Sequence, residues 1–184
     1  MTRVVLLCWL ALLMTARPSP ADSIPDPVEQ RHVRITEPRL RQLFAAGLQG
    51  SPTFRSLVER LEQSDVVVYL QSDIYGSPGV AGRLTFLSVV AGTRYVVVRL
   101  TPLPSVVQQL GMIGHELQHA VEVAERPEIV DAESMFREYM RFGYLNGASG
   151  SGVAVDTRAA MEVGSLVSDE LRGVPLDASP AVLP

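Results

Sequence analysis

The sequence predicts an α+β domain with N-terminal helices, then a three-stranded antiparallel sheet, and then further helices. Apolar residues recur at helical spacing over residues 38–62, β-branched and apolar residues dominate residues 66–100, and helical spacing returns after residue 105. The 184 residues are 47% apolar and 20% charged, which is ordinary for a globular chain and sufficient for one hydrophobic core. We therefore expect a single folded domain.

Two helices are expected before the sheet. Thr36 can cap the first, which begins at Glu37 and ends near the glycines at 47 and 50, and Ser51-Pro52 starts the second. Each helix has one apolar face, formed by Leu40, Leu43, Phe44 and Leu48 in the first and by Phe54, Leu57, Val58 and Leu61 in the second. These faces should pack on the sheet.

Three strands are expected over residues 66–70, 84–90 and 95–100. The first is apolar on both faces, which is typical of a buried strand. The second and third are joined through Ala91-Gly92-Thr93 and are expected to form a hairpin. We interpret the three strands as one antiparallel sheet.

Further helices follow the sheet. A long helix is expected over residues 106–125, and Asp131 can cap another that covers residues 132–142. Residues 143–152 are rich in glycine and serine and are expected to form a flexible loop. A last helix over residues 156–171 and a flexible tail from about residue 173 complete the chain.

The first residues have the layout of a secretory signal peptide. Met1 to Arg3 supplies a positive charge, residues 4–16 form an apolar stretch, and residues 17–21 contain small residues suited to cleavage. As a helix this stretch would span only about 20 Å of the ~30 Å hydrocarbon core of a bilayer, which favours cleavage over a retained anchor. We expect a signal peptide at residues 1–21 and a secreted or periplasmic domain at residues 22–184, without stable membrane insertion after cleavage. The oligomeric state is left open.

Charge and cysteine content argue against two other kinds of function. The net charge is −4 and the arginines are scattered, so no nucleic-acid partner is expected. The single cysteine, Cys8, lies in the expected signal peptide, so the mature domain would have neither disulfides nor thiolate chemistry.

The helix over residues 106–125 carries the run His115-Glu116-Leu117-Gln118-His119. At about 100° per residue, the apolar stripe around Ile113 faces the core, whereas His115, His119 and Glu122 lie on the opposite face. The two imidazoles, one turn apart, can bind a single zinc ion, and Glu116 beside them can take a proton from a water molecule on that ion. The chain has three histidines, and two of them flank this glutamate, which favours a metal site over a merely polar face.

This run resembles the signature of the zincin metallopeptidases, His-Glu-x-x-His on a helix that follows the sheet, and looks closest to the gluzincin branch. The resemblance covers His115, Glu116, His119 and the order of hairpin then helix, and the wider run from Gly114 to Ala120 is similar to that of exported bacterial proteins. It implies a zinc cofactor, a peptide or protein substrate, and Glu116 as the general base. It also implies an edge strand that aligns the substrate, here from the hairpin at 84–100.

The third metal ligand is left open among four carboxylates. Glu122 ranks first, because it lies on the histidine face three residues after His119 and its side chain leans towards the ion. Its alternative role is an outer carboxylate that orients an imidazole. Glu138 ranks second, because some gluzincins bring a glutamate from nineteen residues past the second histidine, and Asp156 and Glu162 on the last helix follow.

Three functions fit these residues. The first is an exported zinc-dependent hydrolase, in particular a peptidase. The alternative is a binding or scaffold domain that keeps a zincin-like fold without turnover, and the third is a metal-dependent hydrolase of a non-peptide substrate. The histidine face points away from the apolar stripe, so another element must cover it before there is a cleft.

Overall fold

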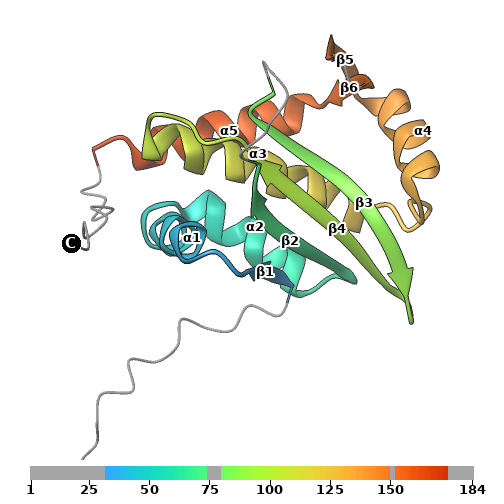
Figure 1. The fold of residues 1–184 in the computed structure, drawn as a ribbon, viewed down its shortest axis with the longest axis horizontal. Helices are drawn as coiled ribbons and strands as arrows, with labels where there is room; N and C mark the ends of the chain where they lie inside the picture. Colours follow the sequence, from blue (N-terminus) through green and yellow to red (C-terminus); the bar gives the residue numbers. More distant parts are fainter. Residues whose placement is uncertain (1–31, 74–79, 150–151, 174–184) are drawn as a thin grey trace, which may run out of the picture.

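The structure is a computed structural model of the chain and describes residues 32–73, 80–149 and 152–173 (Figure 1). The expected signal peptide and the tail beyond residue 173 lie outside these residues. The elements are β1 (Val33–Ile35), α1 (Pro38–Gly50), α2 (Pro52–Glu62), β2 (Val66–Ser72), β3 (Gly82–Val90), β4 (Thr93–Leu100), α3 (Val106–Ala124), α4 (Ala132–Phe142), β5 (Tyr144–Ser149), β6 (Gly152–Asp156) and α5 (Arg158–Leu171).

The main sheet has four strands in the order β1-β2-β4-β3, and it is mixed rather than antiparallel (Figure 1). The β3–β4 hairpin is confirmed, but β2 pairs in parallel with β4 and β1 pairs in parallel with β2. The predicted three-stranded antiparallel sheet is therefore corrected. Because β2 is apolar on both faces, it suits an inner parallel position, and β1 has three residues, too few to show a pattern.

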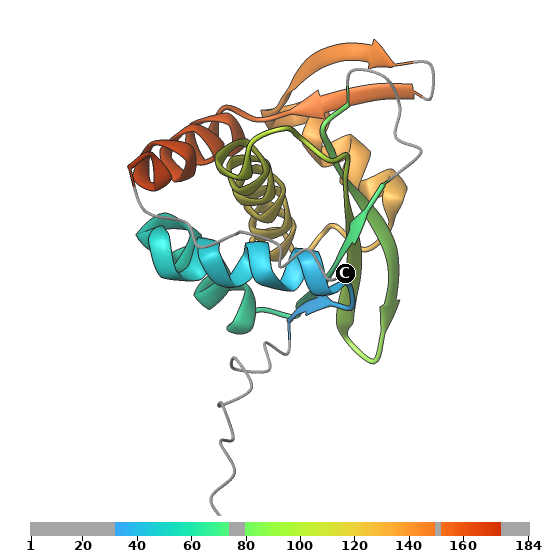
Figure 2. The same cartoon turned by 60° about the vertical axis from the view of Figure 1, so that its left-hand side comes forward.

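Helices α1, α2 and α3 lie on the same side of the four-stranded sheet (Figure 2). The core between these layers includes both predicted helical stripes, with Phe54 and Leu61 fully buried. Helix α2 starts at Pro52 as predicted, and Ser51 caps it, since its hydroxyl accepts a hydrogen bond from the Phe54 N–H at 2.9 Å. Glu37, rather than Thr36, is the N-cap residue of α1, and its carboxylate accepts hydrogen bonds from Ser72 instead of capping the helix.

The chain after α3 differs from the prediction in one element. Asp131 caps α4 as expected, and its carboxylate accepts a hydrogen bond from the Ser134 N–H at 2.7 Å. Residues expected to form a flexible loop instead form the antiparallel hairpin of β5 and β6. Their glycines and serines have low strand propensity, so the sequence gives no strand signal there. Helix α5 then begins after Thr157, which caps it.

Helix α5 packs closely along α3 through glycines on both helices. A Cβ atom on Gly111 would lie 2.9 Å from the Gly164 carbonyl oxygen, and one on Gly164 would lie 3.1 Å from the Cβ of His115. Larger residues would hold the helices further apart. This contact brings the start of α5 beside the histidine face of α3. Nowhere in the described part of the chain is there a helix with the length and hydropathy needed to cross a bilayer.

Candidate metal centre

Helix α3 presents His115 and His119 side by side. Its predicted apolar stripe is confirmed, since Leu110, Ile113, Leu117 and Ala120 are all fully buried. The two imidazole rings lie on the opposite side with centroids 4.8 Å apart and planes at 84°. The one-turn spacing in the sequence therefore brings both rings to one place, as predicted.

Asp156, the last residue of β6, completes a group that can hold a metal ion. Its Oδ1 lies 3.4 Å from Nε2 of His115 and 3.4 Å from Nε2 of His119. One ligand atom from each of the three residues lies within 4.8 Å of the others. Two imidazoles and one carboxylate form a ligand set that zinc accepts in catalytic sites.

The Asp156 carboxylate is held in place from both oxygens. Oδ1 accepts a hydrogen bond from the Thr157 N–H at 2.7 Å, and Oδ2 accepts one from the Asn146 amide at 2.9 Å. Burial would raise the pKa of Asp156, but His119, His115 and the Thr157 N–H together hold it below its usual range. The group is therefore ionised at neutral pH, as a metal ligand must be.

Glu122, ranked first as the third ligand, does not join this group. Its Oε2 lies 2.9 Å from Nδ1 of His119, on the far side of the ring from Asp156, and its Oε1 accepts a hydrogen bond from the Thr157 hydroxyl at 2.6 Å. Although burial opposes ionisation, hydrogen bonds with His119 and Thr157 lower the pKa of Glu122. These contacts fit the alternative role considered for Glu122, that of orienting an imidazole.

The other two carboxylates considered as ligands also lie outside the group. Glu138 on α4 pairs with Arg141 at 3.1 Å, and Glu162 is exposed on α5, beside Met161 and Leu166. Both lie on the helices where they were expected, but Glu162 faces solvent, and the largely buried Glu138 is not among the residues whose ligand atoms gather at the histidines. Asp156, ranked last together with Glu162 and expected on the last helix, instead ends β6, and it is the carboxylate that the fold brings to the histidines.

Glu116 is buried beneath the first residue of β3. A Cβ atom on Gly82 would lie 2.5 Å from Oε1 of Glu116, so only glycine leaves room for the carboxylate there. The side chain is shielded from solvent, and Oε2 has no hydrogen-bond partner within the described residues. Burial raises the pKa of Glu116 to about 7, against an opposing effect from the charge of His119.

Helix α4 and the start of α5 cover the histidine face. The buried Tyr139 on α4 donates a hydrogen bond from its hydroxyl to the His119 carbonyl oxygen at 3.0 Å, and its ring lies 5.5 Å from that of His119. Burial lowers the affinity of His119 for a proton, but Asp156 and Glu122 outweigh it and raise the pKa of His119 to about 9. The predicted need for a covering element is thus met by two helices.

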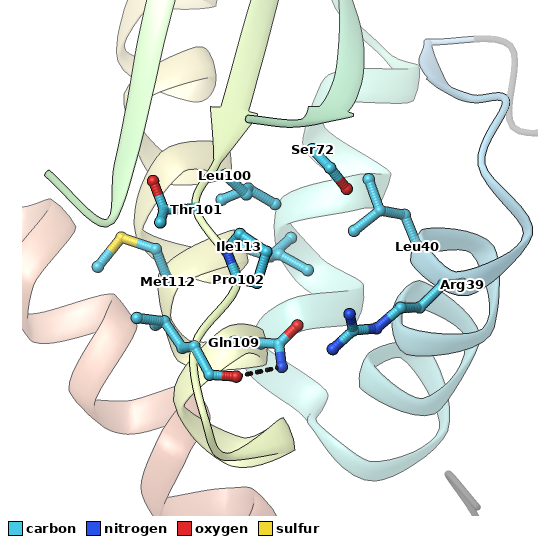
Figure 3. Close-up of a pocket in the computed structure, with 10 residues that line it drawn as sticks. Arg39, Leu40, Ser72, Leu100, Thr101, Pro102, Gln109, Met112 and Ile113 are labelled. Carbon is cyan, nitrogen blue, oxygen red and sulfur yellow. Dashed lines mark hydrogen bonds between the residues drawn. The ribbon is translucent and has the colours of Figure 1, made fainter. Parts of the chain in front are cut away.

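A separate cavity of about 20 Å³ lies between α1 and the first turns of α3 (Figure 3). Arg39, Ser72 and Gln109 line it, and the Gln109 amide donates a hydrogen bond to the Leu103 carbonyl at 2.7 Å. That volume accommodates roughly one water molecule. Neither Glu116 nor any of the three candidate metal ligands lines this cavity, so it is not part of the metal centre.

The sequence did not point to Gly82, Asn146 or Thr157. Thr157 could have been recognised, because a threonine before an apolar periodic run is a typical helix cap. Asn146 and Gly82 carried no such signal, since their roles come from contacts with residues far along the chain. No family model matches this chain, and no curated protein or solved structure shows significant similarity to it.

Proposed function

We propose that this chain is a zinc-dependent hydrolase of peptide or protein substrates, with Glu116 as its general base. The observation that carries the proposal is the buried Glu116 carboxylate. It lies one residue from His115 and has an oxygen without a hydrogen-bond partner within the described residues. Burying an unpaired carboxylate destabilises the fold, and such groups occur commonly in catalytic sites.

His115, His119 and Asp156 would hold the ion. When bound at such a site, zinc lowers the pKa of a water molecule to about 7 and polarises the carbonyl under attack. An Fe2+ ion also accepts two histidines and one carboxylate, in oxygenases. The adjacent buried Glu116 favours hydrolysis, because proton transfer to a carboxylate is a step that hydrolysis needs.

Glu116 is suited to accept a proton and release it again. Its pKa of about 7 places the carboxylate near half-protonation at neutral pH, which is the most effective range for a general base that later acts as an acid. Gly82 leaves room for Oε1, and the buried Oε2 has no hydrogen-bond partner within the described residues, so the carboxylate keeps an electron pair that can accept a proton.

The strand β3 supports a peptide as the substrate. It is the outer strand of the sheet next to β4, and its first residue lies directly over Glu116. An outer strand can pair with an extended chain through backbone hydrogen bonds, which would lay a peptide bond beside the base. We further propose that the domain acts after export, in the periplasm or outside the cell, with no nucleic-acid partner.

The Glu116→Gln variant tests this function against the scaffold alternative. Gln keeps the shape of the side chain but cannot accept a proton, so we expect kcat/KM for an unstructured protein substrate to fall by about 10²–10⁴-fold. Zinc content, measured by mass spectrometry, should stay at wild-type stoichiometry. A purified wild-type protein that binds zinc but cleaves nothing in a broad peptide library would support the scaffold. One that carries iron instead would point to oxygenase chemistry.

A further inference from the structure

The candidate metal ligands come from two elements that must be held together. His115 and His119 lie on α3, whereas Asp156 ends β6 immediately before α5. A metal ion binds tightly only if ligands from both elements are already in place. The question is therefore which side chain joins α3 to the start of α5.

Glu122 and Thr157 form that junction. Glu122 contacts Nδ1 of His119 with one oxygen and accepts the Thr157 hydroxyl hydrogen bond with the other, at 2.9 Å and 2.6 Å. Both residues are almost completely buried. The contact links residues 35 apart in the chain, one on α3 with the histidines and the other directly after Asp156.

Thr157 extends the link to the third ligand. Its backbone N–H donates to Oδ1 of Asp156 at 2.7 Å, and its hydroxyl oxygen accepts from the Ala160 N–H at 3.0 Å, which caps α5. The hydroxyl can accept from Ala160 and donate to Glu122 at the same time. A continuous set of hydrogen bonds therefore runs from His119 through Glu122 and Thr157 to Asp156.

We infer that Glu122 is a positioning residue for the metal, because it fixes the His119 ring and the Asp156 carboxylate relative to each other without binding the ion. An ionised carboxylate can only accept hydrogen bonds, so Glu122 keeps the hydrogen of His119 on Nδ1 and leaves Nε2 facing Asp156. This inference rests on the proposed metal site and adds that Glu122 contributes to the affinity of that site for zinc.

The protein contains a matched control for this pair. Glu170 on α5 also joins two elements, since it accepts hydrogen bonds from the hydroxyls of Ser51 and Thr53 at the start of α2. Like Glu122 it accepts a threonine hydroxyl hydrogen bond, but it is partly exposed and its hydrogen bonds go to Ser51 and Thr53 rather than to a candidate ligand. A change at Glu170 therefore reports the cost of losing a carboxylate link without a metal role.

The experiment measures the zinc affinity of the full mature chain by competition with a chromophoric chelator. The variants are Glu122→Gln, Thr157→Val, the double variant, Thr157→Ser and Glu170→Gln, and the melting temperature of each metal-free protein is recorded beside its Kd. We expect Glu122→Gln and Thr157→Val each to weaken zinc binding roughly 10–100-fold, as the loss of an outer hydrogen-bond partner does. Thr157→Ser keeps the hydroxyl, so its zinc affinity should equal that of the wild type.

The double variant and the Glu170→Gln control test whether Glu122 positions the metal ligands. Because both single changes cut the same link, the double variant should lose much less than the product of the two single losses. Glu170→Gln should lower the melting temperature with Kd unchanged. Equal Kd for Glu122→Gln and the wild type, or multiplying losses in the double variant, overturns the inference. A wild type that binds no zinc overturns the proposed metal site as well.

Discussion

Among the carboxylates near the histidines, Asp156 differs in what its oxygens touch. Its two oxygens are aligned by the Thr157 N–H and the Asn146 amide, and Oδ1 faces both imidazoles. The two Glu122 oxygens contact His119 Nδ1 and the Thr157 hydroxyl, and Glu138 pairs with Arg141. A ligand is thus identified by the direction in which its free electron pairs point, rather than by distance along the chain.

The exchange of Asp156 for Asn tests this assignment. Asn keeps the size of the side chain but loses the charge that a zinc ligand needs, so the loss in zinc affinity should exceed the roughly 10–100-fold cost of losing an outer partner. Glu138→Gln is the control, and its Kd should equal that of the wild type. Chelator competition gives both values. A larger effect at Glu138 than at Asp156 would assign the third ligand to α4.

At the level of elements, the contact of α3 with α5 sets the geometry of the site. Gly111 and Gly164 allow the two helix backbones to approach closely, and Gly164 lies against the Cβ of His115. A Cβ atom at residue 164 already makes tight contacts at 3.1 Å, so a branched side chain there would push α5 outward, together with Thr157 and Asp156 at its start. Stability and metal binding are therefore both expected to depend on this contact.

The Gly164→Val variant makes the dependence measurable. An isopropyl group inserted between packed helices should lower the free energy of unfolding by about 1–3 kcal/mol, and zinc affinity should fall because Asp156 moves with α5. Ser165→Val is the control, since Ser165 is exposed and its exchange should change neither quantity appreciably. Denaturant unfolding and chelator competition report the two effects. Unchanged zinc affinity in a destabilised Gly164→Val protein would separate the helix contact from the site.

The other end of α3 is fixed by a buried arginine on β4. The Arg94 guanidinium donates hydrogen bonds to the carbonyl oxygens of Val123, Ala124, Arg126 and Ile129, and it forms an ion pair with Asp65 at 2.6 Å. The last carbonyls of a helix have no partner within the helix, so a side chain that binds them ends it. Arg94 therefore holds the turn between α3 and α4, and with it Tyr139 over His119.

At the scale of the whole molecule, the sequence predicts the features that depend on residues close together in the chain. It misses the features that depend on contacts between residues far apart in the chain. The phase of α3, the β3–β4 hairpin and the caps at Ser51 and Asp131 follow from spacing within a few residues. The parallel pairing of β2 with β4 depends on which strands meet after folding. That Asp156, rather than another carboxylate, lies beside the histidines also depends on a long-range contact, because α5 must first pack on α3.

The acid stability of the molecule follows from the ion pair of Asp65 with Arg94. The hydrogen bond from Arg94 lowers the pKa of Asp65 below its usual value, which is about 3.9 in an unfolded chain. A carboxyl with a lowered pKa stabilises the fold above the unfolded value, and this contribution disappears as the pH falls through the folded value. We therefore expect the free energy of unfolding to fall as the pH drops below about 4.

The Asp65→Asn variant isolates that contribution, because every other titrating group is the same in both proteins. The variant should be less stable than the wild type at pH 7, and the difference should shrink as the pH falls below about 4 and disappear once the pH passes the lowered pKa of Asp65 in the folded wild type. Urea unfolding in the presence of a chelator keeps metal loss out of the comparison. Parallel stability curves for the two proteins at all pH values would show that Asp65 does not couple folding to protonation, and that Arg94 holds the end of α3 through the helix carbonyls alone.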